Sequence, residues 1–424
     1  MPVRRLPVRP DLEQLKRQAK EFLAALHAAD ASAIAELRQH HPDHVDPANA
    51  KLADAHLALA RSYEASSWPR LAQAVRLADA IWMDDVDSVQ RLITSNPALL
   101  SDPVLIRADS HWGPPMTYAA NLGRDRIIRM LRDLGAADLE SAAARAALHG
   151  HVATARMLYD MAGRPRIRGD ALGGPAYTLN VDGTALLISL GARVRDEAGQ
   201  RLAPVDVVLQ TDARNPAAKH AILEMYAREG LELPDTPTMA LHRGRIDLLA
   251  AHIERDPSVL TRTFPHREIY PREMGCGDAI DAVSGTPLAG TTLLHMCVEF
   301  DELEIGRWLI ERGADVNARS AIGRDGFGGY TPLFNTVVSQ PNFWMNYHKR
   351  GPFVAPFTEL LLEHGADPNV RASIWKQLGP GHDPTTTRHD YRDVTPLSWG
   401  RKFHERIFVS EPAMQRIEAV GGRE

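Results

Sequence analysis

The chain contains very little cysteine, with only Cys276 and Cys297 among its 424 residues. Two cysteines cannot build a disulfide scaffold, and their scarcity is typical of proteins that work in a reducing compartment. We therefore expect a cytoplasmic protein. Cys297 falls at a small apolar position of a predicted helix, so it is expected in the core and not as a reactive thiol.

Long apolar runs and an excess of one charge are also missing. No run of about 18 apolar residues occurs, and no apolar stretch follows the positively charged start, so we expect neither a membrane span nor a signal peptide. The formal net charge is −5, which gives no electrostatic reason to expect nucleic acid or a membrane surface as a partner. Aromatic residues make up 6%, as expected where alanine and leucine fill the space between stacked helices.

The most informative segment that is present covers residues 290–319. It opens with Gly290-Thr291-Thr292-Leu293-Leu294-His295 and closes with Arg312-Gly313-Ala314-Asp315-Val316-Asn317. These two signatures enclose a helix–turn–helix unit, and the whole resembles one ankyrin repeat. A single such unit cannot bury its own apolar face. The resemblance therefore implies an all-α fold: an ankyrin-repeat solenoid with β-hairpin fingers.

Further copies of the pattern surround this unit. Thr331-Pro332-Leu333 and Thr395-Pro396-Leu397 open two more clear units, and each threonine is expected to cap a helix. Residues 76–260 hold degenerate copies. Residues 1–75 are helical without matching the repeat; Asp11 and Ser67 are predicted N-caps there. We expect three parts: an N-terminal helical cap (1–75), degenerate ankyrin repeats (76–260), and C-terminal repeats with long insertions (261–424). The arrangement is similar to that of a bacterial ankyrin-repeat family.

Four insertions interrupt the C-terminal repeats, at 261–289, 320–330, 339–356 and 372–393. Insertions into repeats map to loops, often on the binding side. These four carry large aromatic and charged residues, which are costly on a loop unless something covers or uses them. We expect them to converge on one pocket, with 339–356 folding across the concave face as a lid. The candidate binding residues are Asp281, Glu299, Tyr330, Asn335, Trp344, Tyr347, Trp375, Arg388, Asp390 and Tyr391.

The resemblance implies a protein–protein interaction module whose partner contacts the concave face. The alternative is an enzyme, hydrolase- or lyase-like with acid–base carboxylates, or a receptor for an anionic or polyhydroxylated small molecule. No nucleophile elbow, phosphate-binding loop or dinucleotide fingerprint is present, so catalysis is the less favoured interpretation and no cofactor is expected. No metal site is expected, because Cys276, His266 and His382 lack a short-spaced ligand pair. His295 is expected to bond the backbone of the adjacent turn.

Overall fold

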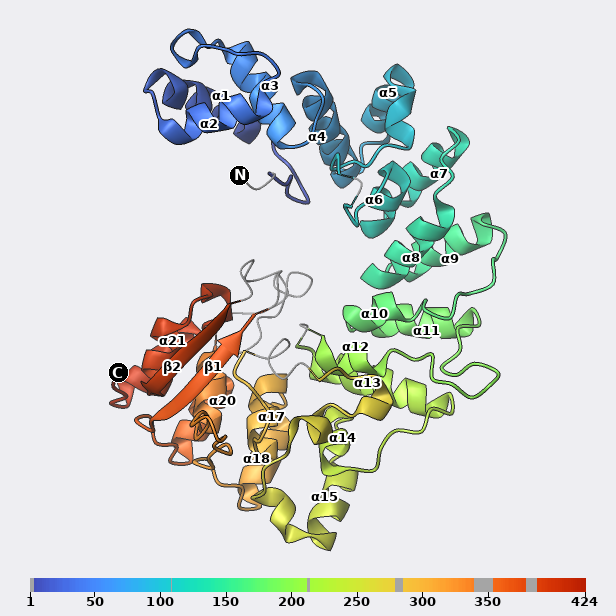
Figure 1. The fold of residues 1–424 in the computed structure, drawn as a ribbon. Helices are drawn as coiled ribbons and strands as arrows, with labels where there is room; N and C mark the ends of the chain where they lie inside the picture. Colours follow the sequence, from blue (N-terminus) through green and yellow to red (C-terminus); the bar gives the residue numbers. More distant parts are fainter. Residues whose placement is uncertain (1–3, 108, 212–213, 279–284, 339–353, 379–386) are drawn as a thin grey trace. The chain divides into compact units, whose positions relative to one another are not determined.

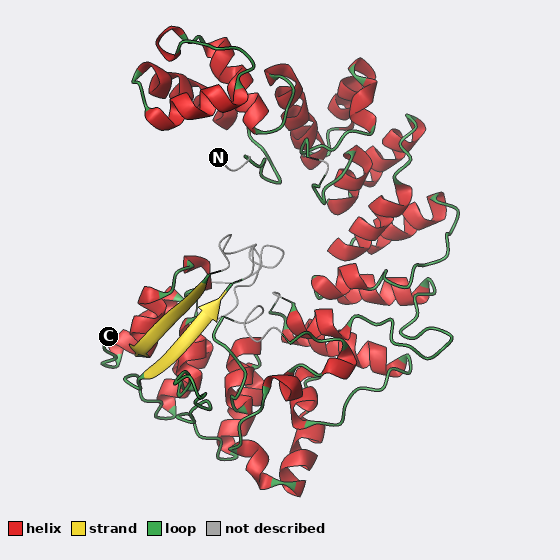
Figure 2. Cartoon of the chain, in the orientation of Figure 1, coloured by secondary structure: helices red, strands yellow, loops and turns green. Residues whose placement is uncertain are grey.

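The computed structural model describes residues 4–107, 109–211, 214–278, 285–338, 354–378 and 387–424. Helices dominate these residues, and one pair of strands is the only sheet among them (Figure 2). The chain forms two compact units, residues 1–166 and residues 167–424. No helix among the described residues is long and apolar enough to cross a bilayer. The three-part division expected from the sequence stays a prediction.

The first unit begins with three helices. One small apolar cluster around Leu26 lies among them, and a second around Leu15 also includes Leu71 and Val75 of the fourth helix. As expected, Asp11 caps the first helix by accepting from the amides of Glu13 and Gln14, and Ser67 caps the fourth. The remaining helices form successive pairs, α4–α5, α6–α7 and α8–α9, each contacting the next (Figure 1). The helices are α1 (Leu12–His27), α2 (Ala31–His40), α3 (Leu52–Ser62), α4 (Trp68–Trp82), α5 (Val86–Ser95), α6 (Pro115–Asn121), α7 (Asp125–Asp133), α8 (Leu139–His149) and α9 (Val152–Met161).

The second unit continues the same pairing. The first helix of each pair contacts the first helix of the next pair, as in α14 with α17, α17 with α19 and α19 with α21. The second helices α18, α20 and α22 likewise contact one another in turn. Its helices are α10 (Gly173–Tyr177), α11 (Val181–Ser189), α12 (Val205–Gln210), α13 (Pro216–Arg228), α14 (Pro237–His242), α15 (Ile246–Arg255), α16 (His266–Ile269), α17 (Leu293–Phe300), α18 (Leu303–Glu311), α19 (Pro332–Val337), α20 (Pro356–Glu363), α21 (Pro396–Lys402) and α22 (Glu411–Ala419). Short 3₁₀ helices lie at Pro47–Asn49, Pro97–Leu100, Pro257–Leu260, Arg272–Met274 and Arg406–Phe408.

The two predicted threonine caps differ in the structure. Thr395 begins α21 and its hydroxyl accepts from the amide of Ser398, as expected. Thr331 also stands at the N-cap of α19, but its buried hydroxyl has no hydrogen-bond partner among the described residues. The expected cap bond at Thr331 is therefore wrong. The amide of Phe334, which should donate to the hydroxyl, donates instead to the backbone carbonyl of Thr331 at 3.0 Å.

The last helix pair seals the second unit with apolar side chains. Leu397 and Ile417 are buried, at 2% and 0% exposed, whereas Val420 is 55% exposed. An inward position for Val420, which the helical spacing suggests, is wrong because Val420 is the C-cap of α22 and follows its last turn.

The strands β1 (Ala372–Gln377) and β2 (Arg388–Val394) pair antiparallel, with Trp375 opposite Asp390. An isolated bridge between Gly328 and Ser373 joins the preceding insertion to β1. Alternate residues face opposite sides of the pair, as the strand geometry requires. Ile374 and Tyr391 are buried on the inner side, where β2 contacts α21. The outer side carries Arg388, Asp390 and Arg392, whereas Lys376 is fully buried on the inner side.

Candidate functional site

The ten candidate residues fall into three sets. Asp281, Trp344 and Tyr347 lie outside the described residues, so the predicted convergence of four insertions stays a prediction. Glu299 is buried on α17, Asn335 is buried on α19, and Tyr330 is buried just before the N-cap of α19. The other four, Trp375, Arg388, Asp390 and Tyr391, lie on the strand pair.

Three of these four candidates belong to an arginine–aromatic cluster. We define this cluster as Phe327, Trp375, Arg388, Asp390 and Arg392. The guanidinium carbon of Arg388 lies 4.3 Å from the ring centre of Trp375 and 5.0 Å from that of Phe327. The guanidinium carbon of Arg392 lies 4.3 Å from the ring centre of Phe327. Two arginines and two aromatic rings therefore alternate along the outer side of the strands. Stacking of this kind holds a guanidinium in a fixed plane.

Carboxylates complete the arginine–aromatic cluster. The Arg388 Nε donates to Asp390 Oδ1 at 2.8 Å, and Arg392 Nη2 lies 3.8 Å from Asp390 Oδ2. Asp325 Oδ2 lies 3.9 Å from Arg388 Nη2. The side chains of Arg388 and Asp390 remain 43% and 42% exposed. The cluster is thus preorganised and still accessible to solvent.

Tyr391, although adjacent in sequence, faces the other way. Its ring meets that of Trp399 edge-on at 4.7 Å, and its hydroxyl lies 2.6 Å from Nδ1 of His404. Burial raises the pKa of the Tyr391 hydroxyl to about 12, against a smaller opposite effect of His404. Tyr391 therefore anchors β2 to α21 and does not share a surface with the arginine–aromatic cluster.

Glu299, at the end of α17, is held in a buried ion pair. Arg214 Nη2 donates to its Oε1 at 3.1 Å, and Arg214 Nε donates to its backbone carbonyl at 2.8 Å. The amide of Gly285 also donates to Oε1, at 3.1 Å. The Arg214 and Glu299 side chains are 5% and 0% exposed. This placement gives Glu299 a structural partner and no access to solvent.

A second buried pair lies beside the first. Lys219 Nζ is 2.8 Å from Glu302 Oε1, and His220 Nε2 is 2.8 Å from the same oxygen. Burial alone would raise the pKa of Glu302, but the Lys219 ammonium and the His220 hydrogen bond outweigh it and lower that pKa. The Phe300 ring lies between the pairs, 4.5 Å from Lys219 Nζ and 5.6 Å from the guanidinium carbon of Arg214.

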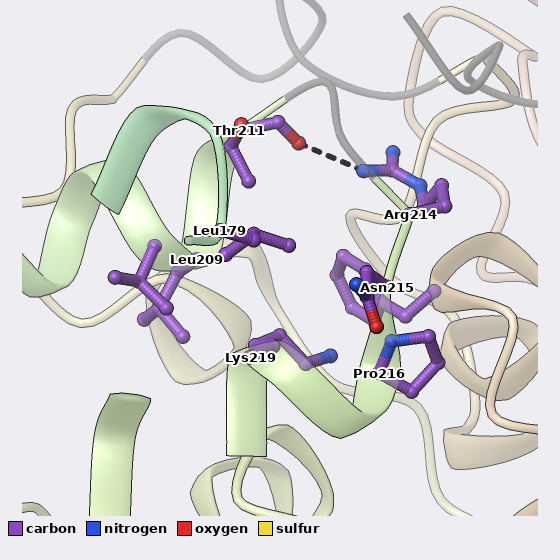
Figure 3. Close-up of a pocket in the computed structure, with 9 residues that line it drawn as sticks. Leu179, Leu209, Thr211, Arg214, Asn215, Pro216 and Lys219 are labelled. Carbon is purple, nitrogen blue, oxygen red and sulfur yellow. Dashed lines mark hydrogen bonds between the residues drawn. The ribbon is translucent and has the colours of Figure 1, made fainter. Parts of the chain in front are cut away.

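A small cavity is lined by Arg214, by Lys219 of α13, and by Val208 and Leu209 of α12. Figure 3 shows the Arg214 and Lys219 side chains there, with Arg214 bonded to the carbonyl of Thr211. Its volume is about 10 Å³, which is room for about one water molecule. Pockets that bind drug-sized ligands are roughly 300–1,000 Å³. The cavity is therefore too small to be a substrate pocket.

The segment 285–288 covers α19 and α21. Thr286 Oγ1 donates to the carbonyl of Val338 at 2.7 Å and accepts from Trp399 Nε1 at 3.2 Å. The Tyr330 hydroxyl donates to the carbonyl of Pro287 at 2.9 Å. The end of the first insertion thus contacts α19 and α21. The lid expected from 339–356 over Glu299, Tyr330 and Asn335 stays a prediction, because residues 339–353 lie outside the described part. Asn335 beneath is 0% exposed, and neither atom of its amide has a hydrogen-bond partner among the described residues.

The histidine and cysteine expectations are confirmed. His295 Nε2 lies 3.1 Å from the carbonyl of Tyr330, so its ring ties α17 to the residue just before the N-cap of α19. Cys297 is fully buried. Within the described ranges, no group of three His, Cys, Asp or Glu side chains is placed to hold a metal ion.

Comparison with known proteins finds a family match for one helix pair, α17–α18. The family model for the ankyrin repeat matches residues 289–321. That segment is similar to an ankyrin repeat. Among solved structures, the human ASB11 ankyrin repeat domain matches with 14% sequence identity and a TM-score of 0.25, over 73% of this chain and 99% of its own. A score of this size carries no argument about function. No curated protein matches the chain.

Sequence reasoning missed the buried ion pairs. Arg214, Lys219 and Glu302 belong to no motif, and their spacing along the chain gives no sign of their contacts. Phe327 was also missed, although its glycine-rich hairpin was recognised as an insertion.

Proposed function

We propose that this chain is a protein-binding ankyrin-repeat solenoid that works in the cytoplasm. The ankyrin-repeat match at 289–321 supports the proposal, since ankyrin repeats generally mediate protein–protein interaction. Two buried cysteines without a disulfide are compatible with a reducing compartment. We assign the binding side to the insertions and to the concave face formed by the first helices.

The observation that carries this proposal is the arginine–aromatic cluster. Tryptophan and arginine are the residues most enriched at the energetic centres of protein interfaces. Trp375 and Arg388 are already stacked, so a partner would not have to order them, and the entropic cost of binding is reduced. The ion pairs of Arg388 with Asp390 and Asp325 are exposed, and exposed pairs contribute only about 0.2–1 kcal/mol. A partner carboxylate can therefore replace them.

The enzyme alternative finds no comparable support. Of its carboxylate candidates, Glu299 is buried in an ion pair, Asp390 is paired with Arg388, and Asp281 lies outside the described residues. The cavity beside Arg214 is too small for a substrate.

Site-specific photo-cross-linking tests the proposal. A photoreactive phenylalanine analogue replaces Trp375 in the full chain in cells, and the same analogue replaces Trp308 in a control. Trp308 is matched because it is also half-buried and stacked by an arginine, with the guanidinium carbon of Arg312 4.0 Å from its ring centre. We expect a discrete cross-linked protein from position 375 and none from position 308.

Arg388→Ala should then abolish the adduct from position 375, while Arg312→Ala should not affect it. Equal adducts from both positions, or an adduct that survives Arg388→Ala, would refute binding through the arginine–aromatic cluster.

A further inference from the structure

Residues 4–10 of the first unit form an extended arm that lies against the helices following it. Its exposure alternates like that of a strand bound on one side: Arg4, Leu6, Val8 and Pro10 are the less exposed residues. Arg5, Pro7 and Arg9 between them are exposed. The arm pairs with no strand among the described residues, so side chains and single backbone groups hold it.

The upstream half of the arm is held by α2, α3 and α4. The amide of Arg4 donates to the carbonyl of Ser62 at 2.9 Å. The Arg4 guanidinium donates through two nitrogens to both carboxylate oxygens of Glu36, each at 3.0 Å. Leu6 packs against the apolar cluster that contains Tyr63, Leu71 and Val75. This half is recognised by one fork-shaped ion pair and one apolar contact.

The downstream half is held by α4 and α6. The Tyr118 hydroxyl donates to the backbone carbonyl of Val8 at 2.6 Å. Arg9 Nη2 donates to Asp79 Oδ1 at 3.0 Å, and its guanidinium carbon lies 5.6 Å from the ring centre of Trp82. An acidic group beside an aromatic ring is a receptor for arginine, since it combines an ion pair with a cation–π contact.

Tyr118 is the feature least explained by packing alone. Its side chain is 0% exposed, and within the described residues its hydroxyl has no hydrogen-bond partner other than the Val8 carbonyl. A buried hydroxyl without a partner is costly. The Val8 carbonyl of the extended arm satisfies this buried donor on α6.

We propose that Glu36, Ser62, Asp79, Trp82 and Tyr118 form a docking surface for an extended arginine-bearing peptide of a partner protein. The chain's own arm occupies this surface in the structure. The charged anchors are only partly covered: Arg9 and Asp79 are 48% and 53% exposed, and Arg4 and Glu36 are 37% and 12% exposed. The exposed Arg9–Asp79 pair contributes little, so a partner segment of the same chemistry can displace the arm from its downstream half. This site is independent of the arginine–aromatic cluster.

The test uses the full chain with three arm substitutions, Arg4→Ala, Leu6→Ala and Arg9→Ala, and a fluorescent synthetic peptide of residues 1–12. Fluorescence anisotropy should show saturable binding to the triple variant. Binding to the unsubstituted chain should be at least about tenfold weaker, because a tethered arm competes at a high effective concentration. In the triple variant, Tyr118→Phe should weaken peptide binding by about fivefold through the loss of one hydrogen bond. Tyr159→Phe, at a half-buried tyrosine of α9, should leave it unchanged.

Three results would overturn the proposal. One is the absence of saturable binding to a triple variant whose thermal melting equals that of the unsubstituted chain. Another is equal affinity for both chains. The third is a concentration-dependent dimer of the unsubstituted chain that is lost on adding peptide, which would assign the surface to arm exchange between two copies.

A second measurement covers the case in which the triple variant does not fold. A fluorophore is attached to Arg5→Cys in the otherwise unsubstituted chain, where residue 5 is exposed and both native cysteines are buried. Excess unlabelled peptide should release the arm and lower the anisotropy of the fluorophore. A peptide with alanine in place of both arginine anchors should not, and no change with the native peptide would refute the proposal.

Discussion

Glu302→Gln should destabilise the second unit far more than an ordinary surface substitution. The Lys219 and Glu302 side chains are 6% and 3% exposed, so the substitution leaves a buried ammonium without its carboxylate. Breaking a buried ion pair in this way costs about 3–5 kcal/mol. The Phe300 ring, 4.5 Å from Lys219 Nζ, offsets only part of that cost, because a cation–π contact contributes about 0.5–2 kcal/mol.

Urea unfolding followed by tryptophan fluorescence measures this loss, and hydrogen exchange of residues 293–300 localises it. Glu304→Gln is the matched control, since Glu304 is exposed in the first turn of the same helix. It should change the stability by less than about 0.5 kcal/mol. Adding Lys219→Met to Glu302→Gln removes the stranded charge and should recover most of the loss, because replacing a whole buried pair is often neutral. A loss below about 1 kcal/mol for Glu302→Gln, or a double variant as unstable as the sum of the single ones, would refute this account.

The same pair gives a pH dependence with a definite sign. The pKa of Glu302 is lower in the folded chain than its ordinary value. Its contribution to stability is therefore fully present above the ordinary carboxyl pKa of about 4.3. That contribution is lost as the pH falls through the lowered folded value. The unsubstituted chain should lose stability more steeply than Glu302→Gln between about pH 4 and the onset of acid unfolding, and parallel curves would contradict this assignment.

Four further substitutions test two helix ends, a turn and a buried indole. Thr395→Val should cost about 1 kcal/mol because it removes a working N-cap. Thr331→Val should be close to neutral because the hydroxyl it removes has no hydrogen-bond partner among the described residues; equal losses in thermal melting would contradict the difference. Gly244→Ala should cost roughly 1–3 kcal/mol in urea unfolding, since Gly244 has a φ of +66° and an added Cβ would lie 2.2 Å from Nδ1 of His220; an unchanged midpoint would refute this. Trp399→Ala should cost about 3–5 kcal/mol and raise hydrogen exchange in 285–288, because the indole is fully buried and bonded to that segment; unaltered exchange there would argue against its anchoring role.

Much of the fold can be predicted from the sequence because its signals are local. The caps at Asp11, Ser67 and Thr395 require only a side chain and an amide two or three residues away. The turn at Gly150 needs a positive φ, here 78°, which glycine adopts readily. His295 follows from the resemblance, and its bond to the Tyr330 carbonyl is present.

The candidate site could be predicted only where its residues share one insertion. Trp375, Arg388 and Asp390 lie within one strand pair, so placing the insertion places all three. Thr331 failed as a cap because a competing backbone bond, which the residue type does not determine, takes the amide. Arg214 and Glu299 stand 85 residues apart, and no local spacing indicates their contact.

The two buried ion pairs also limit how this chain can change in evolution. Arrays of repeats commonly gain or lose a unit, since each repeat contacts only its neighbours. Here Arg214 precedes α13 and Lys219 lies in its first turn, while Glu299 lies in the last turn of α17 and Glu302 is the N-cap of α18. The pair α14–α15 lies between them in sequence. Duplicating or deleting α14–α15 would separate or misplace four charges that are buried together. We therefore expect the number of helix pairs between α13 and α17 to be constrained by these buried charges.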